Sequence, residues 1–128
     1  MARLLIADDN AALRRTMGRV LEAAGHDVAL AENARDALEL CRRNPVDVII
    51  TDLYMPEMDG IELLLQAQNE CPEVPIIAMS GGGEVVNQDL LRDAMILGAV
   101  AALPKPFKED ALLNAIDRAL ADRGRHDA

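Results

Sequence analysis

The run Val48-Ile49-Ile50-Thr51-Asp52 decides the fold, because four residues suited to a buried strand end in a carboxylate. β-Branched residues favour strands, and a run that is apolar on both faces is typical of a parallel strand covered by helices on both sides. We therefore expect a central strand over residues 47–51, with Asp52 at its carboxyl end.

Four other short apolar runs along the chain have the same character. We expect strands over residues 3–7, 27–31, 75–79 and 100–103. Apolar residues at helical spacing separate consecutive runs, and another helical pattern follows the last run. Asn33 is placed as the N-cap of the second helix. Five strands that alternate with five helices predict an α/β fold with a doubly wound parallel sheet, since right-handed crossovers leave few other arrangements.

Polar residues follow four of these strands. Asp8 and Asp9 follow the first, Asp52 the third, Ser80 the fourth and Lys105 the fifth. Ligands of open α/β sheets bind outside the carboxyl ends of the strands, so these side chains should meet in one crevice. Carboxylate oxygens suit Mg²⁺, and three aspartates with one lysine carry a formal charge of −2. We expect a site for a metal ion and a phosphoryl group.

Composition excludes several classes of protein. The chain has 128 residues, 51% of them hydrophobic, and a net charge of −9, which argues against nucleic acid as a partner. No apolar stretch approaches the roughly 20 residues of a membrane span. The two aspartates after the first apolar run exclude a signal peptide. We expect a single domain over residues 1–122 and a frayed tail over residues 123–128.

Cys41 and Cys71 are the two cysteines of the chain. Cys41 falls on the apolar face of a helical pattern, and Cys71 follows another helix. Buried, reduced thiols in a cytoplasmic protein are the prediction, and a disulfide or a metal pair is the less favoured alternative.

The motifs together resemble the receiver domain of bacterial two-component response regulators, of the chemotaxis-regulator-like type. Each motif alone is weak, but their joint order and spacing over residues 3–120 is specific. The resemblance implies a flavodoxin-like sheet with strand order 2-1-3-4-5. It rests on Asp8-Asp9, Asp52-Leu53-Tyr54-Met55-Pro56, Asp59-Gly60, Ser80 and Lys105-Pro106-Phe107.

The resemblance also implies a role for each residue that holds the metal or accepts the phosphoryl group. Asp52 is the phosphoacceptor and also a ligand of Mg²⁺. Asp8 and Asp9 hold the ion, one of them directly and one partly through water, and the backbone carbonyl of Tyr54 completes the protein's share. Lys105 pairs with the phosphoryl oxygens, and a cis peptide joins it to Pro106.

The remaining residues implied by the resemblance surround the phosphoryl group. The Ser80 hydroxyl would bond one phosphoryl oxygen, and Leu53 and Gly81 would neighbour the group. Receivers usually carry an aromatic residue three positions before the lysine, but this chain has Ala102 there. We expect Ser80 still to close on the phosphate, with the signal passing through the glycine-rich loop after it and the fourth helix.

The function that the resemblance implies is that of a stand-alone response regulator in the cytoplasm. A histidine kinase or a histidine phosphotransfer protein would phosphorylate Asp52 with Mg²⁺. The signal would pass by contact with an unknown downstream protein, without nucleic acid or membrane. A phosphorelay intermediate and a phosphate sink are alternatives. No enzymatic activity is expected beyond self-phosphorylation and autodephosphorylation.

Rival functions use a related topology or chemistry. A phosphohydrolase of the haloacid dehalogenase type needs a second aspartate two positions after its nucleophile, where this chain has Tyr54. A flavodoxin needs aromatic residues to stack its flavin, and the chain has only one tyrosine and one phenylalanine. A degenerate receiver that serves as a plain interaction module would not need all five chemical positions filled.

Simpler structural roles are also open at each position. Asp8 and Asp9 would merely cap a helix, Asp52 would open a turn, Ser80 would stabilise a turn, and Lys105 would be a solvated loop residue.

Overall fold

A computed structural model of the chain describes residues 2–54, 60–80 and 88–127, with side chains throughout except at residues 60, 88, 89 and 122–127. The strands are β1 (Arg3–Ala7), β2 (Asp27–Ala31), β3 (Val48–Asp52), β4 (Ile76–Ser80) and β5 (Ala101–Pro104). The helices are α1 (Ala11–Ala23), α2 (Ala34–Arg43), α3 (Gly60–Glu70), α4 (Gln88–Ile96) and α5 (Glu109–Asp127).

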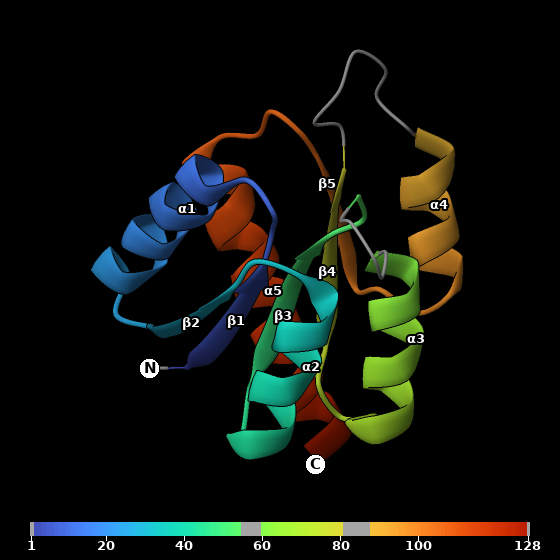
Figure 1. Cartoon of the computed structure of the whole chain (residues 1–128). Helices are drawn as coiled ribbons and strands as arrows, with labels where there is room; N and C mark the ends of the chain where they lie inside the picture. The colour runs from blue at the N-terminus through green and yellow to red at the C-terminus, as the bar shows by residue number, and fades with distance from the viewer. Residues whose placement is uncertain (1, 55–59, 81–87, 128) are drawn as a thin grey trace.

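The five strands form one parallel sheet in the order β2-β1-β3-β4-β5 (Figure 1). Helices α1 and α5 cover one face of this sheet, and α2, α3 and α4 cover the other. The predicted doubly wound α/β fold and its strand order are confirmed. Parallel strands place all their carboxyl ends at one edge, which is where Figure 1 shows the ends of β1, β3, β4 and β5.

Three strands end one residue later than the sequence predicts. β3 and β4 include Asp52 and Ser80, and β5 continues to Pro104. The reason is that hydrogen bonds between neighbouring segments continue past the apolar runs. The N–H of Leu53 donates to the carbonyl of Met79 at 2.9 Å, and the N–H of Lys105 donates to the carbonyl of Ser80 at 2.7 Å. The polar residues are thus held by the rigid sheet itself.

Asparagine side chains cap the amino ends of the first two helices. Asn33 caps α2 as predicted, since its side chain accepts a hydrogen bond from the N–H of Asp36 at 2.8 Å. Asn10 caps α1 and accepts from the N–H of Leu13 at 3.1 Å. The simpler role considered for Asp8 and Asp9, capping of the first helix, is therefore wrong. Their carboxylates remain available at the sheet edge.

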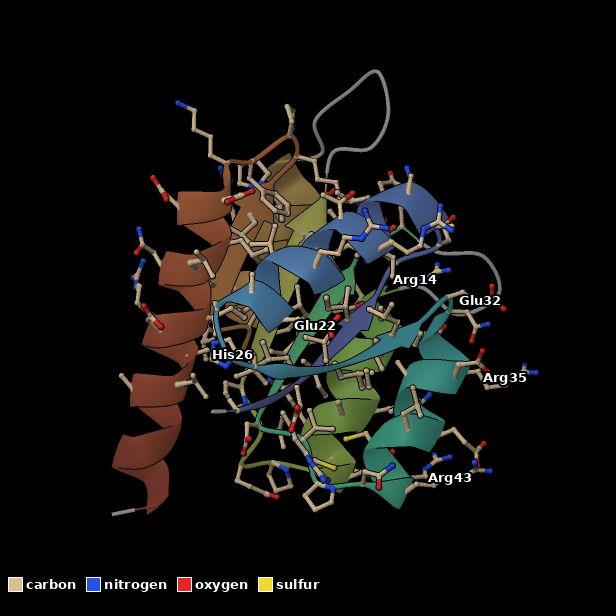
Figure 2. All side chains as sticks on the ribbon, turned by 90° about the vertical axis from the view of Figure 1, so that its left-hand side faces the viewer. Arg14, Glu22, His26, Glu32, Arg35 and Arg43 are labelled. Carbon is tan, nitrogen blue, oxygen red and sulfur yellow. The ribbon has the colours of Figure 1, made fainter. Side chains whose placement is uncertain are left out.

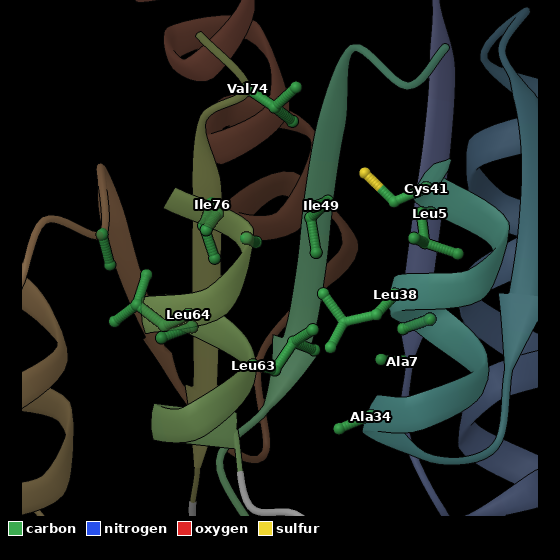
Figure 3. Packing of buried hydrophobic residues seen from close by; sticks show 14 of the residues in the cluster. Leu5, Ala7, Ala34, Leu38, Cys41, Ile49, Leu63, Leu64, Val74 and Ile76 are labelled. Carbon is green, nitrogen blue, oxygen red and sulfur yellow. The ribbon is translucent and has the colours of Figure 1, made fainter. Parts of the chain in front are cut away.

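Aliphatic side chains fill the core on both faces of the sheet. Along β1 the side chains alternate, as a strand requires: Leu5 packs toward α2 and α3, and Leu4 and Ile6 pack toward α1 and α5. Figure 3 shows the first cluster, in which Leu38 of α2 and Leu63 of α3 approach Ile49 of β3. Burial of these groups contributes most of the stabilisation, at about 25 cal/mol per Å² of apolar surface.

The ends and loops of the chain bear on three further expectations. The backbone of α5 is helical as far as Asp127, while the domain over residues 1–122 and the fraying of residues 123–128 stay predictions. The loop expected over residues 55–59 and the glycine-rich turn at residues 81–83 lie outside the described residues. Within the described residues, no helix combines the length and hydrophobicity needed to cross a membrane.

Gly98, in the turn between α4 and β5, offers a test of the contact between this turn and Gln68 of α3. Its φ of +118° favours glycine, and an added Cβ would meet the Gln68 side chain on α3. Gly25 has a φ of +96° with nothing near the added Cβ. Gly25→Ala should lower the free energy of unfolding by about 1–2 kcal/mol through backbone strain alone, and Gly98→Ala should lower it further.

Urea unfolding of both variants measures this difference. The double variant Gly98→Ala with Gln68→Ala should lose about as much free energy of unfolding, relative to Gln68→Ala alone, as Gly25→Ala loses relative to the wild-type chain. Equal destabilisation by the two single variants would mean that Gln68 gives way freely and does not hold α3 against this turn.

Candidate functional site

Three carboxylates meet at the carboxyl edge of the sheet. Asp8 follows β1, Asp9 comes next in the chain, and Asp52 is the last residue of β3. One carboxylate oxygen from each lies within 4.8 Å of the others. Asp8 is 0% and Asp52 5% exposed, while Asp9 is open to solvent. The predicted gathering of these three side chains is thus present in the structure.

Lys105 joins two of these carboxylates. Its Nζ donates to Oδ2 of Asp8 at 2.9 Å and to Oδ2 of Asp52 at 3.2 Å. The lysine side chain is 9% exposed, so it is not the solvated loop residue of the simpler alternative. The peptide bond from Lys105 to Pro106 is cis, as the resemblance implied.

Backbone groups fix the orientation of the buried carboxylates. The second oxygen of Asp8, Oδ1, accepts from the N–H of Asn10 at 2.9 Å. Oδ1 of Asp52 accepts from the N–H of Tyr54 at 3.1 Å, a turn-type bond that coexists with the contact to Lys105. Each carboxylate therefore has one oxygen held by the backbone and one oxygen directed at the ammonium group. This arrangement orients the site without help from a ligand.

Burial is the largest single influence on the pKa values of Asp52 and Lys105, but it sets the direction of the shift only for Asp52. Burial raises the pKa of the Asp52 carboxyl and the charge of Asp8 raises it too, against the opposing effects of the Tyr54 N–H and of Lys105. Burial alone would lower the pKa of Lys105, but the hydrogen bond to Asp8 and the negative charges of Asp52 and Asp8 outweigh it, so this pKa is raised. The ammonium group is the charge that makes two buried carboxylates tolerable.

Ser80 contributes a buried hydroxyl at the end of β4. The residue is 0% exposed, and no described residue forms a hydrogen bond with its Oγ. Leaving a buried hydroxyl without a partner costs about 1–3 kcal/mol. A turn-type bond from this hydroxyl would reach the residues just after Ser80, which lie outside the described residues, so the simpler role as a turn residue stays a prediction.

The other predicted site residues lie at different depths around this edge. Leu53 is buried in the core beside α2 and α3, and Tyr54 is 58% exposed. Ala102 pairs with Ala78 in the sheet register and lines a groove of about 440 Å³ between α4 and α5. Gly81 lies outside the described residues.

Two contacts of this site escaped the sequence analysis. Arg14 of α1 donates from Nη1 to the backbone carbonyl of Asp8 at 2.7 Å, and Asn10 holds the Asp8 carboxylate. A basic residue one turn into the helix after an acidic pair is the only sequence signal for the Arg14 contact.

Figure 2 shows Arg14 on α1 and His26 beyond the other end of that helix, where His26 accepts from the N–H of Ala2 at 3.3 Å.

The donor set fits a hard divalent cation. Carboxylate oxygens of Asp8, Asp9 and Asp52 converge, and oxygen-only ligands with room for water are what Mg²⁺ prefers. No described cysteine or histidine joins this group, so the site lacks the nitrogen and sulfur ligands typical of zinc.

Comparison with known families identifies the family of the chain. A family model described as the response regulator receiver domain matches residues 4–117. The chain belongs to this family. Receiver domains act in two-component systems, in which they interact with histidine kinases and serve as phosphoacceptor switches.

Curated relatives of this receiver domain differ in length. The response regulator receiver protein CpdR of Brucella abortus (strain 2308) is 36% identical over 123 residues, which cover 94% of this chain and 98% of CpdR. The transcriptional regulatory protein GlrR of Escherichia coli (strain K12) is 36% identical over 119 residues, which cover 93% of this chain. The chain spans only 26% of the length of GlrR.

Solved structures share the whole fold. A receiver domain protein from Clostridium thermocellum matches with a TM-score of 0.90 and 28% identity, over 97% of this chain and 98% of that one. A CheY-like receiver protein from Methanospirillum hungatei JF-1 matches with a TM-score of 0.86 and 28% identity, over 98% of each chain.

The ion pairs of Lys105 give a prediction for stability and its pH dependence. Lys105→Met should cost about 3–5 kcal/mol near neutral pH, because it leaves two buried carboxylates without a cation. Lys105 lowers the pKa of Asp52, so its loss raises that pKa further. The folded variant then binds a proton more tightly than its unfolded chain, and the cost of the substitution should shrink as the pH falls toward about 4–5.

Urea unfolding of Lys105→Met at several pH values measures this trend, with the exposed Lys108→Met as the matched control. Asp52→Asn in the same chain should recover part of the loss at neutral pH. A cost that did not change with pH, or no recovery by Asp52→Asn, would contradict the electrostatic account.

Proposed function

We propose that Asp52 accepts a phosphoryl group from the phosphohistidine of a histidine kinase or a histidine phosphotransfer protein. The observation that carries this proposal is the bridge from Lys105 to both Asp8 and Asp52 inside a buried carboxylate cluster. Asp52 ends the central strand, and Lys105 beside it lowers the pKa of its carboxyl against the effect of burial, which favours the ionised form whose oxygen can attack phosphorus. Family membership supports the same assignment.

The transfer step exchanges one bond to phosphorus for another. An oxygen of Asp52 forms a bond to phosphorus while the bond from phosphorus to the histidine nitrogen breaks, and that nitrogen keeps the electron pair and takes up a proton. Phosphoryl transfer depends mainly on positioning and on neutralising the transferred oxygens. Lys105 already lies 3.2 Å from Oδ2 of Asp52 and is placed to pair with those oxygens.

We propose that Mg²⁺ is held by the carboxylates of Asp8, Asp9 and Asp52 and by the backbone carbonyl of Tyr54. When bound, Mg²⁺ neutralises the charge shared between the carboxylates and the phosphoryl group. The backbone N–H groups of Asn10 and Tyr54 fix the orientation of the Asp8 and Asp52 carboxylates.

Ser80 is the residue that we propose to report the phosphorylated state. Its buried hydroxyl has no hydrogen-bond partner among the described residues, so a phosphoryl oxygen on Asp52 would satisfy it. The small side chain of Ala102 has no rotamer to switch, and we propose that the signal leaves through the segment after Ser80 and α4 instead. A groove between α4 and α5 lies beside Ala102, which is consistent with this proposal.

The signal then passes, in this proposal, to another protein by direct contact in the cytoplasm. CpdR, which this chain matches over 98% of its length, supports a response regulator of this size. Relay of the phosphoryl group to a further histidine, or its storage as a sink, is the alternative output of the same site. Nothing in the proposal requires catalysis on a separate substrate.

Phosphorylation of Asp52 is tested directly with a small phosphodonor. Acetyl phosphate with Mg²⁺ should raise the intact mass of the chain by one phosphoryl group, and chelator should prevent it. Asp52→Asn should abolish the added mass, because the amide lacks the nucleophilic oxygen. Asp117→Asn, an exposed site on α5 with the same change of charge, should be phosphorylated like the wild-type chain. Persistent labelling of Asp52→Asn would contradict the assignment.

The metal site is tested by thermal unfolding with and without Mg²⁺. Asp9 adds a like charge beside Asp8 and Asp52, so Asp9→Asn should raise the melting temperature in chelator by about 2–4 °C. Mg²⁺ should raise the melting temperature of the wild-type chain and leave that of Asp9→Asn nearly unchanged. Asp117→Asn should retain the full metal response. An unchanged or lower melting temperature of Asp9→Asn in chelator would count against the cluster.

A further inference from the structure

Two thiols meet far from the carboxylate cluster. Sγ of Cys41, in the last turns of α2, lies 3.4 Å from Sγ of Cys71, the residue that follows α3. Both cysteines are free, and they are the only two in the chain. They come from segments 30 residues apart in the sequence, so this contact is made by the packing of the two helices and not by local chain geometry.

An ion pair fixes the same two helix ends. Arg42 and Glu70 are the immediate neighbours of the two cysteines, and Nη2 of Arg42 lies 2.9 Å from Oε1 of Glu70. Nε of the same arginine donates to that oxygen at 3.1 Å. The N–H of Cys71 also donates to the carbonyl of Ala67 at 2.7 Å, so the helical hydrogen bonding of α3 reaches the cysteine itself. The ion pair and this backbone bond thus restrict the two helix ends that carry the sulfur atoms.

The two thiols differ in their access to solvent. Cys41 is buried in the cluster beneath α2, and Cys71 is half-buried. Burial, followed by the contact with Cys71, raises the pKa of the Cys41 thiol to about 12. Cys71 is therefore the thiol that a small solute meets first, with Cys41 directly behind it.

We propose that Cys41 and Cys71 form a peroxide-sensitive pair that closes into an intramolecular disulfide. Sulfur of Cys71 attacks one oxygen of hydrogen peroxide, the O–O bond breaks, and a sulfenic acid and water result. Sulfur of Cys41 then attacks the sulfur of Cys71, and the S–O bond breaks. The displaced hydroxide leaves as water with the proton of Cys41. Two thiols are oxidised, one peroxide is reduced to two waters, and an excess of a small dithiol reverses the change.

The disulfide would enclose β3 and therefore the strand that ends in Asp52. Closing a loop of this length restricts the unfolded chain, and we expect the melting temperature of the oxidised chain to rise by about 5–10 °C. The pair lies near the amino ends of β3 and β4, and Figure 3 shows Cys41 on the side of Val74 and away from Ala34. The carboxyl edge of the sheet should keep its geometry.

The test treats the reduced, full chain with hydrogen peroxide and then alkylates it after unfolding. The wild-type chain should lose two hydrogen atoms in mass, lose both alkylation sites, stay monomeric, and regain both sites after treatment with dithiothreitol. Cys41→Ala and Cys71→Ser should each retain the mass of an uncrosslinked monomer or gain oxygen at the remaining thiol. Peroxide that yields only disulfide-linked dimers, or only sulfinic acid at Cys71 in the wild-type chain, would overturn the proposal.

The ion pair supplies a matched pair of variants with both cysteines intact. Arg42→Ala should slow disulfide closure by about 2–5-fold, the range that a partly exposed ion pair contributes. Arg43→Ala removes the neighbouring arginine, whose ion-pair partner among the described residues is Glu39 of the same helix, and this variant should close at the wild-type rate. Equal rates for both variants would overturn the positioning of the thiols by Arg42. Acetyl phosphate labelling of the oxidised chain should match that of the reduced chain, so this result is separable from the proposed role of Asp52.

Discussion

One ammonium group contacts two buried carboxylates, and this contact restricts how the strands can end at the carboxyl edge of the sheet. Lys105 lies within 3.2 Å of both Asp8 and Asp52, and all three side chains are almost fully withdrawn from water. Desolvating these charges opposes folding unless each one is paired and hydrogen-bonded. The ends of β1 and β3 and the segment after β5 must therefore stop at one place, which sets the register of the sheet at this edge.

The sheet, packed on both faces with aliphatic side chains, holds the strand ends in these positions. Hydrogen bonds from Leu53 to Met79 and from Lys105 to Ser80 extend the sheet into the site, so the polar residues inherit the order of the core. Two faces packed with leucine, isoleucine, valine, alanine and methionine supply the stabilisation that the buried charges do not. The strand edge consequently offers an acidic site whose orienting bonds come from the protein backbone.

Periodicity and polar residues at strand ends were enough to predict the fold class and the meeting of Asp8, Asp9, Asp52 and Lys105. The sheet order followed from the resemblance and is confirmed by the register. Strand ends were misplaced by one residue because polar side chains hide the continuing backbone ladder. The contact of Arg14 with the carbonyl of Asp8 was missed because its signal, a basic residue one turn into the helix, is weak. The approach of the Cys41 and Cys71 sulfurs was missed because it arises from how α2 and α3 pack and leaves no pattern along the chain.

Because aromatic residues are nearly absent, Tyr54 can serve as an optical probe of the site. The chain contains one tyrosine and no tryptophan, and that tyrosine is 58% exposed with its backbone N–H bonded to Asp52. Tyrosine fluorescence from the native chain therefore originates beside the carboxylate cluster. Excitation in the tyrosine band largely avoids the one phenylalanine, so the unmodified protein contains its own local probe of ionisation and occupancy at this edge.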